Sequence, residues 1–163
     1  MKAAGVVALI SNSFYASAQN GDSLDFQVFR GLLYADYGNT KSALLEGGWL
    51  YGKGNDSSVI YYLPDGRDWE NSANQIIVSF RFDAFGRRTM KLQSVSYCTT
   101  NDGAVRIFAA GMDEAKFILV DEQAGSPVAM SMYQNAVETI YDWEFYFQKT
   151  EKHSHMWTIS RRQ

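Results

Sequence analysis

The sequence is poor in the residues that mark several large classes of protein. It holds one cysteine and two prolines among 163 residues. With Cys98 alone no internal disulfide can form, so the chain is not a disulfide-stapled small domain. Cys98 ends the alternating run 94–98, where we expect it to be a small buried hydrophobic residue. The scarcity of proline excludes a Pro-rich linker.

Positive charge is not in excess either. The chain carries 15 Lys and Arg against 18 Asp and Glu, a net charge of −3. Adjacent basic residues occur only at 87–88 and 161–162. Because a nucleic-acid binder normally presents a basic surface to phosphates, we expect no nucleic-acid partner.

Long apolar runs are missing as well. No run approaches the about 20 residues that cross a bilayer, which predicts no stable membrane span. The run at 3–10 follows Lys2 and precedes Ala16-Ser17-Ala18, the small-x-small pattern of a signal-peptidase site. We therefore predict a signal peptide over 1–18, a single domain over 19–163, and a secreted or periplasmic location. The alternative is that 1–18 forms an ordinary first element of the domain.

The known catalytic motifs do not occur. There is no Walker loop, no Gly-x-Gly-x-x-Gly, no Gly-x-Ser-x-Gly and no His-Glu-x-x-His. His153 and His155 share one side of an extended chain, but two histidines without a third ligand make a poor metal site. Asp142 and Glu144 also share a side, which we expect to face solvent. We predict that the protein is not an enzyme and has neither a metal site nor a cofactor.

Apolar and aromatic side chains are abundant, at 46% and 15% of the chain. This composition excludes a disordered chain, and the length suits one domain with a substantial core. Helical spacing over 24–45 places Phe26, Phe29 and Leu32 on one face, with Thr40 as the predicted N-cap of a second short helix.

From Trp49 onward the apolar period changes to two, which is typical of strands. Asn-Asp-Gly and Pro-Asp-Gly sequences between the runs are specific turn signals. We predict an all-β fold, an antiparallel up-and-down β-barrel of about 8 to 10 strands with an N-terminal helical segment, because closure removes exposed edges. The predicted strands are 49–53, 58–63, 75–83, 89–98, 104–109, 116–121, 128–134, 137–148 and 155–161.

Two short motifs carry a family resemblance. The segment 44–49 (LLEGGW) resembles the short helix and Gly-x-Trp entry of lipocalin-type (calycin) barrels, and 157–162 (WTISRR) is similar to their closing strand. The stretch 141–157 also resembles the last hairpin of uncharacterised bacterial secreted lipocalin-like proteins. The resemblance implies barrel closure by Arg packing over Trp, and the residues that would close the barrel are Trp49, Arg161 and Arg162.

If the barrel closes, one face of each strand lines its interior. We predict that the protein binds a small hydrophobic molecule there, its only predicted partner, in a pocket rich in Met and aromatic residues. One alternative is a filled barrel that serves as a structural or protein-interaction domain. Another is a haem-binding calycin barrel that uses His155, because 48–54 resembles the Gly-rich first strand of such barrels. The predicted ligand-binding residues are Phe80, Phe82, Phe117, Met130, Met132, Tyr141, Trp143 and Phe145.

Overall fold

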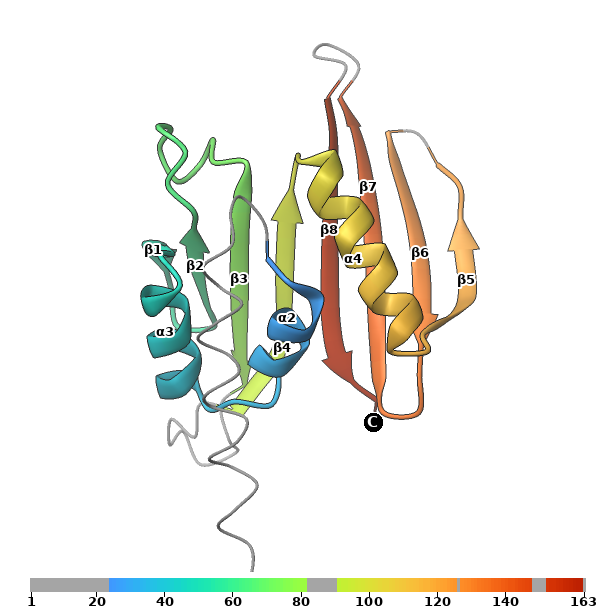
Figure 1. Cartoon of the computed structure of the whole chain (residues 1–163), viewed down its shortest axis with the longest axis horizontal. Helices are drawn as coiled ribbons and strands as arrows, with labels where there is room; N and C mark the ends of the chain where they lie inside the picture. Colours follow the sequence, from blue (N-terminus) through green and yellow to red (C-terminus); the bar gives the residue numbers. More distant parts are fainter. Residues whose placement is uncertain (1–23, 82–90, 126, 148–151, 163) are drawn as a thin grey trace, which may run out of the picture.

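The computed structural model describes residues 24–81, 91–125, 127–147 and 152–162. The predicted signal peptide and the predicted pocket residue Phe82 lie outside these ranges. Within them, one antiparallel sheet of eight strands has the order β1-β2-β3-β4-β8-β7-β6-β5 (Figure 1). The strands are β1 (Leu50–Gly54), β2 (Ser58–Tyr62), β3 (Asn74–Arg81), β4 (Lys91–Thr99), β5 (Ile118–Gln123), β6 (Val128–Gln134), β7 (Glu138–Phe147) and β8 (Lys152–Arg161).

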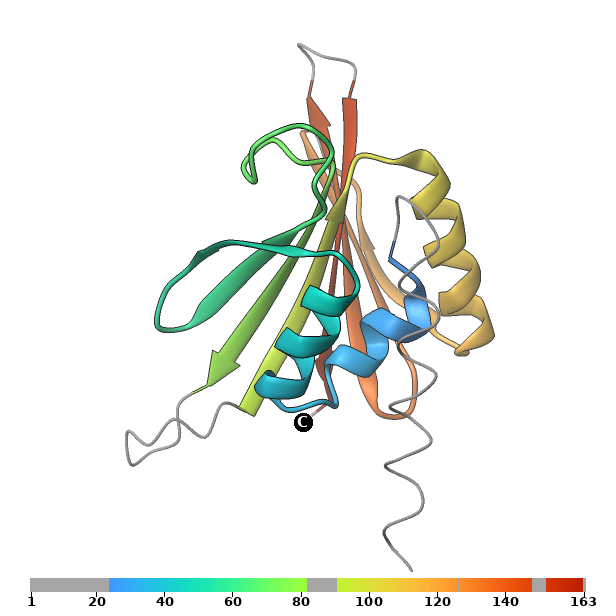
Figure 2. The same cartoon turned by 60° about the vertical axis from the view of Figure 1, so that its left-hand side comes forward.

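The prediction of a β-rich, antiparallel up-and-down fold with an N-terminal helical segment is confirmed, but the predicted closure into a barrel is wrong. β1 and β5 are opposite edges of an open sheet, and the described strands include no pair between them. β8 does not meet β1, because it pairs with β4 at the centre. Figure 2 shows the helices on one side of the sheet. Helices that cover one face provide the burial that closure would otherwise supply.

The residues expected to close the barrel make other contacts. Trp49 is buried, but its ring meets that of Tyr97 edge-on at 6.4 Å. The guanidinium of Arg161 lies 4.9 Å from the ring centre of Tyr34, and Arg162 donates a hydrogen bond to a backbone carbonyl in the β6–β7 turn. The predicted Trp–Arg contact is therefore wrong, because the central position of β8 carries its arginines away from the β1 edge.

The two N-terminal helices begin at aspartates. Asp25 caps α2 (Phe26–Leu32) and Asp36 caps α3 (Tyr37–Glu46), each side chain accepting hydrogen bonds from backbone N–H groups of the first turn. Thr40, the predicted N-cap, instead lies buried within α3. The interruption between the two helices therefore lies a few residues earlier than predicted.

The predicted strand 104–109 is wrong, because this segment belongs to the 13-residue helix α4 (Asp102–Glu114). Asn101 caps the helix by accepting hydrogen bonds from two backbone N–H groups. Phe108 and Met112, four residues apart, are buried on the same helix face. The helix makes the crossover from β4 to the distant edge strand β5, so the remaining three strands return towards β4 (Figure 1).

An aromatic cluster joins the helices to the sheet. Phe108 of α4 stacks on Trp157 of β8 with ring centres 4.3 Å apart, and Tyr97 of β4 lies beside both. Phe26 and Phe29 of α2 each contact Phe108 at 5.0 Å. The cluster fixes the two halves of the sheet and two helices in one core.

A buried ion pair holds the end of α2 on the sheet. Glu138 of β7 is fully buried and accepts hydrogen bonds from the Arg30 guanidinium, the Tyr34 hydroxyl and the Asn135 amide. Burial alone would raise the pKa of Glu138, but these hydrogen bonds outweigh it and lower the pKa. Burial and the bond to Glu138 raise the pKa of Tyr34 to about 12.

We expect Gly111→Ala to destabilise the protein although alanine favours helices. A Cβ at position 111 would lie 2.4 Å from the Cβ of Phe26, so α2 and α4 must separate. Overpacking costs about 1 to 3 kcal/mol, against about 1 kcal/mol gained in helix propensity. Urea denaturation measures the net loss. Ala110→Gly, at an exposed position of the same helix, measures the effect of helix propensity alone. A Gly111→Ala variant more stable than the wild type would contradict the close packing of α2 on α4.

We expect Glu138→Gln to lower the free energy of unfolding by about 2 to 3 kcal/mol near neutral pH, because it leaves Arg30 without its partner. The lowered pKa means that the carboxylate stabilises the fold above its unfolded value of about 4.3, and this contribution disappears as pH falls through the folded value. In thermal melts from pH 7 to pH 3, the difference in Tm between the wild type and Glu138→Gln should therefore become smaller as the pH falls. A difference in Tm that stays constant with pH would exclude the Glu138 carboxylate as its origin.

Candidate functional site

One face of the sheet carries none of the described helices, and it is the main candidate site. The helices cover the other face, as Figures 1 and 2 show. Along β2, β3, β4, β8, β7 and β6, the strand register assigns alternate residues to the uncovered side. We call this the open face. Its residues are Ser58, Ile60, Tyr62, Gln75, Ile77, Ser79, Ser94, Ser96, Cys98, Ser154, Met156, Thr158, Ser160, Thr139, Tyr141, Trp143, Phe145, Val128, Met130, Met132 and Gln134.

The apolar part of the open face is concentrated on three neighbouring strands. Met130 of β6 pairs with Trp143 of β7, which pairs in turn with Met156 of β8. The rings of Tyr141 and Trp143 stack with centres 6.5 Å apart. We call this set the Met–aromatic patch; its members are half-buried except Val128, which is 36% exposed. They are Val128, Met130, Met132, Tyr141, Trp143, Phe145 and Met156.

The predicted ligand-binding residues fall into two groups that do not meet. Met130, Met132, Tyr141, Trp143 and Phe145 belong to the Met–aromatic patch. The other two that are described, Phe80 and Phe117, are buried on the helix side, where Phe80 contacts Tyr37 and Phe117 contacts Phe26. Because the sheet is open, the two groups do not line a shared interior.

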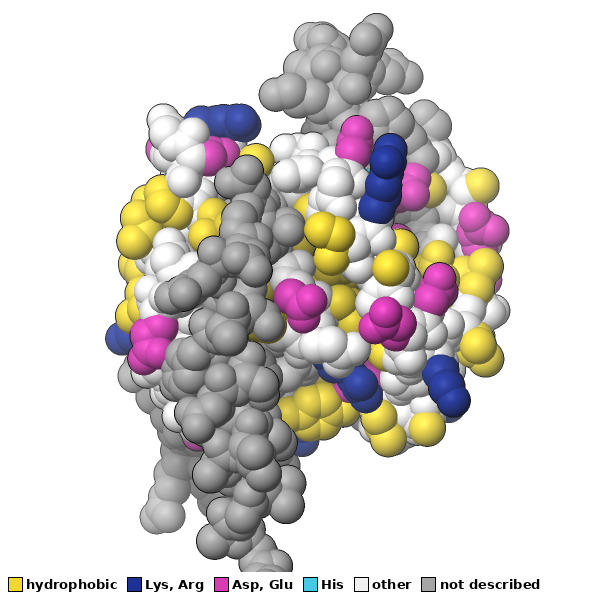
Figure 3. All heavy atoms as spheres, viewed as in Figure 1, with side chains coloured by type: hydrophobic (Ala, Val, Ile, Leu, Met, Phe, Trp, Pro, Cys, Tyr) yellow, Lys and Arg dark blue, Asp and Glu magenta, His cyan; other side chains and the backbone are white. Residues whose placement is uncertain are grey.

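No described open-face side chain on the six strands from β2 to β6 in sheet order is charged, whereas on the two edge strands Lys53 lies opposite Ile60 and Asp121 lies opposite Met132, on the same side of the sheet. Arg81, Lys91 and Lys152 stand at strand ends, and their side chains lie outside the description. Figure 3 views the helix side, where side chains of both charge signs are scattered over the surface. Depletion of charge with enrichment of Met and aromatic residues distinguishes the centre of a protein interface from ordinary surface.

Cys98 lies on the open face between Gln75 and Met156 of the adjacent strands. It is half-buried rather than fully buried as predicted. Burial raises the pKa of its thiol to about 12, so the thiol stays protonated at neutral pH. A protonated thiol is a weak nucleophile and a poor metal ligand. Cys98 therefore contributes apolar surface to this face rather than reactivity.

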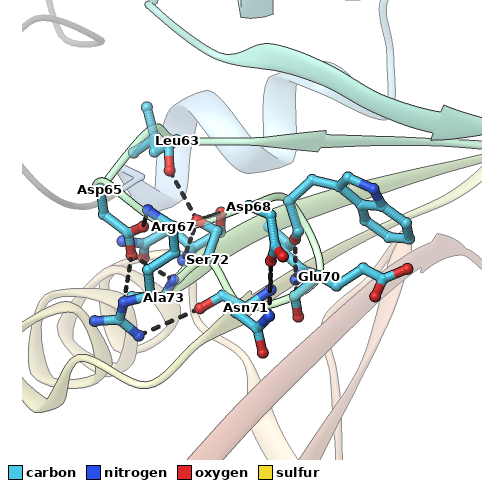
Figure 4. A network of polar contacts seen from close by, with 11 residues as sticks. Leu63, Asp65, Arg67, Asp68, Glu70, Asn71, Ser72 and Ala73 are labelled. Carbon is cyan, nitrogen blue, oxygen red and sulfur yellow. Dashed lines mark hydrogen bonds and ion pairs between the residues drawn. The ribbon is translucent and has the colours of Figure 1, made fainter.

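A polar loop borders the open face at its β1–β3 end (Figure 4). Asp65 accepts a hydrogen bond of 2.8 Å from the backbone N–H of Ala73, and this bond does most to lower the pKa of its carboxyl group. Arg67 pairs with Asp65 at 3.5 Å. Trp69 of this loop packs against β1. Its Cβ lies 3.1 Å from the position that a Cβ would take if Gly52 carried one. The Met–aromatic patch lies at the opposite end of the face, on β6 to β8.

The helix side holds a second candidate, a cleft of about 430 Å³ that includes Glu122, Ser131, Asp142 and Glu144 in its lining. We call it the acidic cleft. His155 adjoins it, with Nδ1 3.5 Å from Oδ1 of Asp142 and 4.0 Å from Oε1 of Glu144. The Asp142 side chain is only 16% exposed, so the expectation that it faces solvent is wrong.

The pKa of His155 is raised by the neighbouring Asp142 carboxylate, which outweighs the opposing effect of burial. In the described part of the chain, Oδ1 of Asp142 and Nδ1 of His155 are buried and make no hydrogen bond. The two atoms lie 3.5 Å apart and attract each other as an ion pair when the imidazole is protonated. The ring of His155 also stacks on that of Trp157 with centres 5.3 Å apart, so both side chains lie on the helix side of the sheet.

The acidic cleft does not have the order of groups that nucleophilic catalysis needs. Ser131 is opposite Asp142 on the adjacent strand, whereas His155 comes from the strand beyond. β6 and β8 are about 10 Å apart, so the carboxylate lies between hydroxyl and imidazole. In a Ser-His-Asp triad the imidazole must occupy the middle position.

The cleft also does not suit the cofactor considered for His155. Haem needs an apolar pocket and cationic partners for its propionates, whereas three carboxylates line this cleft. Among the described residues, no group of three or more His, Cys, Asp or Glu is arranged to hold a metal ion. The side chain of His153 lies outside the description.

We expect Asp142→Asn to lower the pKa of His155. The raised pKa means that protonated His155 stabilises the fold below its unfolded value of about 6.5, and that this contribution is lost as pH rises through the folded value. NMR titration of the imidazole ring protons measures the shift. Glu122→Gln, in the same cleft, should leave the pKa of His155 unchanged. Equal shifts in both variants would show a general field effect rather than a specific pair.

Comparison with known proteins gives no match to a family model, a curated protein or a solved structure. The resemblance to lipocalin-type proteins therefore stays a prediction. Among the described helices, none is both long enough and apolar enough to cross a membrane.

Proposed function

We propose that this protein is a protein-interaction domain that binds its partner through the open face of its sheet. The observation that carries the proposal is the absence of charge among the described open-face side chains of six adjacent strands, together with the Met–aromatic patch on three of them. A surface of this composition loses little on desolvation, because its described side chains include no ion to strip of water.

The patch supplies the side chains that usually dominate binding energy. Full burial of one large apolar side chain contributes about 1.5 to 3 kcal/mol, and aromatic residues near the centre of an interface are the most frequent energetic anchors. Trp143 is bordered by Met130 and Met156 on the neighbouring strands. Flexible methionine side chains around a rigid indole can adjust to the shape of a partner. We place the main anchor at Trp143.

The small-molecule carrier remains the other proposal. In this fold the predicted ligand-binding residues that lie together are those of the Met–aromatic patch, so an apolar molecule would bind on the open face rather than inside a barrel. A flat face buries less of a small ligand than an enclosing pocket does. The geometry therefore favours a large, flat partner surface over a small molecule.

Photo-crosslinking in the source cells tests the interaction proposal. We expect a photoreactive phenylalanine analogue at Trp143 or Met130 to form covalent adducts with a protein. The matched control is Ile107 of α4, which is 51% exposed on the helix side and should give none. Adducts from Ile107 but not from the patch, or no adducts from either, would contradict the proposal.

A lipophilic dye distinguishes the carrier. If the protein binds small apolar molecules, titration of a dye should quench Trp fluorescence with saturation, and Trp143→Ala should weaken the quenching about tenfold or more. We expect weak, non-saturating quenching instead, because the patch does not enclose a ligand. Saturable binding with a defined stoichiometry would favour the carrier.

A further inference from the structure

We propose that the partner of the open face is a second copy of this chain, and that two copies stack sheet against sheet around a two-fold axis. The inference rests on the proposed function, since it names the occupant of the same face. Stacked sheets lie about 10 Å apart, with side chains of the two inner faces interdigitated.

Charge is the first reason to choose a second copy. A two-fold interface brings a surface against itself, so a charge close to the axis meets its own copy and is repelled. The described open-face side chains of the six central strands carry none, so this part of the face can meet itself without repulsion, and the two charges on the same side, Lys53 and Asp121, stand on the opposite edge strands. A foreign partner is usually selected and steered by complementary charges, and the described side chains of the central strands offer none for that purpose.

Area is the second reason. Six strands spaced about 4.8 Å apart, with about six residues each at about 3.3 Å per residue, span roughly 29 Å by 20 Å. This projected area of roughly 600 Å², increased by the relief of the side chains, is of the order of the about 800 Å² per partner in a standard interface. The open face is therefore large enough for a stable dimer without a contribution from other surfaces.

The chemistry of the face suits mutual packing as well. The Met–aromatic patch occupies β6 to β8, while serines are frequent on β4 and β8, as at Ser94, Ser96 and Ser160. Ser96 and Thr158 satisfy each other through a hydrogen bond of 2.8 Å. Hydroxyl groups that are already paired can be buried at little cost. The polar part of the face therefore does not oppose association.

The edge strand β5 offers a competing route to a dimer. Its three consecutive aliphatic residues, Ile118, Leu119 and Val120, are 67%, 51% and 49% exposed. An exposed apolar edge strand can pair with the same strand of another copy and extend the sheet. This arrangement would leave the open face uncovered, so the two routes can be separated by charged substitutions.

Sedimentation equilibrium of the full chain tests the inference. We expect a mass twice the 18.4 kDa of one chain at micromolar concentration. Trp143→Lys should weaken dimerisation at least about 100-fold, since it places a buried charge inside the interface. Val128→Lys should weaken it too, and Val128 is already 36% exposed, so the monomer should tolerate the change.

Two lysine substitutions outside the open face serve as controls, Ile107→Lys on α4 and Val120→Lys on β5, both at exposed positions. Both should remain dimeric, and circular dichroism should show all variants folded. A monomeric wild type at tens of micromolar would overturn the inference. A dimer lost only in Val120→Lys would overturn it in favour of edge pairing.

The photo-crosslinking result separates this inference from the proposed function. Patch adducts with the mass of two chains support both. If the patch forms adducts with a protein of different mass and the chain sediments as a monomer, the proposed interaction domain stands and the homodimer is overturned. The absence of patch adducts overturns both.

Discussion

The stacking of Phe108 on Trp157 is the contact on which the rest of the structure depends. It fixes α4 across the sheet while β8 pairs with β4, and so it joins the two four-stranded halves. The phenylalanines of α2 then pack on the same ring. Since the helices bury the centre of one face, the sheet has no need to close, and no described helix covers its other face. An aromatic contact inside the core thus determines which surface the protein presents.

Much of the fold is readable in the sequence because a strand's period of two is a local property. Eight of the nine predicted strands correspond to strands of the sheet, and their ends differ by up to three residues, as between 155–161 and β8 (Lys152–Arg161). The segment at 104–109 failed because Asn-Asp-Gly was interpreted as a hairpin turn. Asn101 is instead a helix cap, and the four-residue spacing of Phe108 and Met112 supports a helix. The order of strands across the sheet depends on contacts about 60 residues apart, as between Val95 and Ile159, which no local pattern encodes.

The candidate site was predictable in its membership but not in its location. Alternation correctly placed Tyr141, Trp143 and Phe145 on one side of a strand. It could not tell which side faces the helices, because both sides of β7 carry apolar residues. Ile140 is buried in the core, whereas Asp142 on the same side borders a cleft. A usable signal was present, since the described open-face positions of the six strands from β2 to β6 in sheet order contain no charge. Recognising it requires the strand order, which only the three-dimensional structure supplies.

The central position of β8 has a consequence for synthesis on the ribosome. β8, which completes the middle of the sheet, is the last of the described strands to be made, so the nascent chain holds two incomplete halves until β8 emerges. During that interval β4 and β7 each lack the neighbour that will later cover them. Unpaired strand edges favour intermolecular pairing. The emerging chain is thus most prone to aggregation just before β8 emerges, and a truncation that removes β8 would leave that vulnerability permanent.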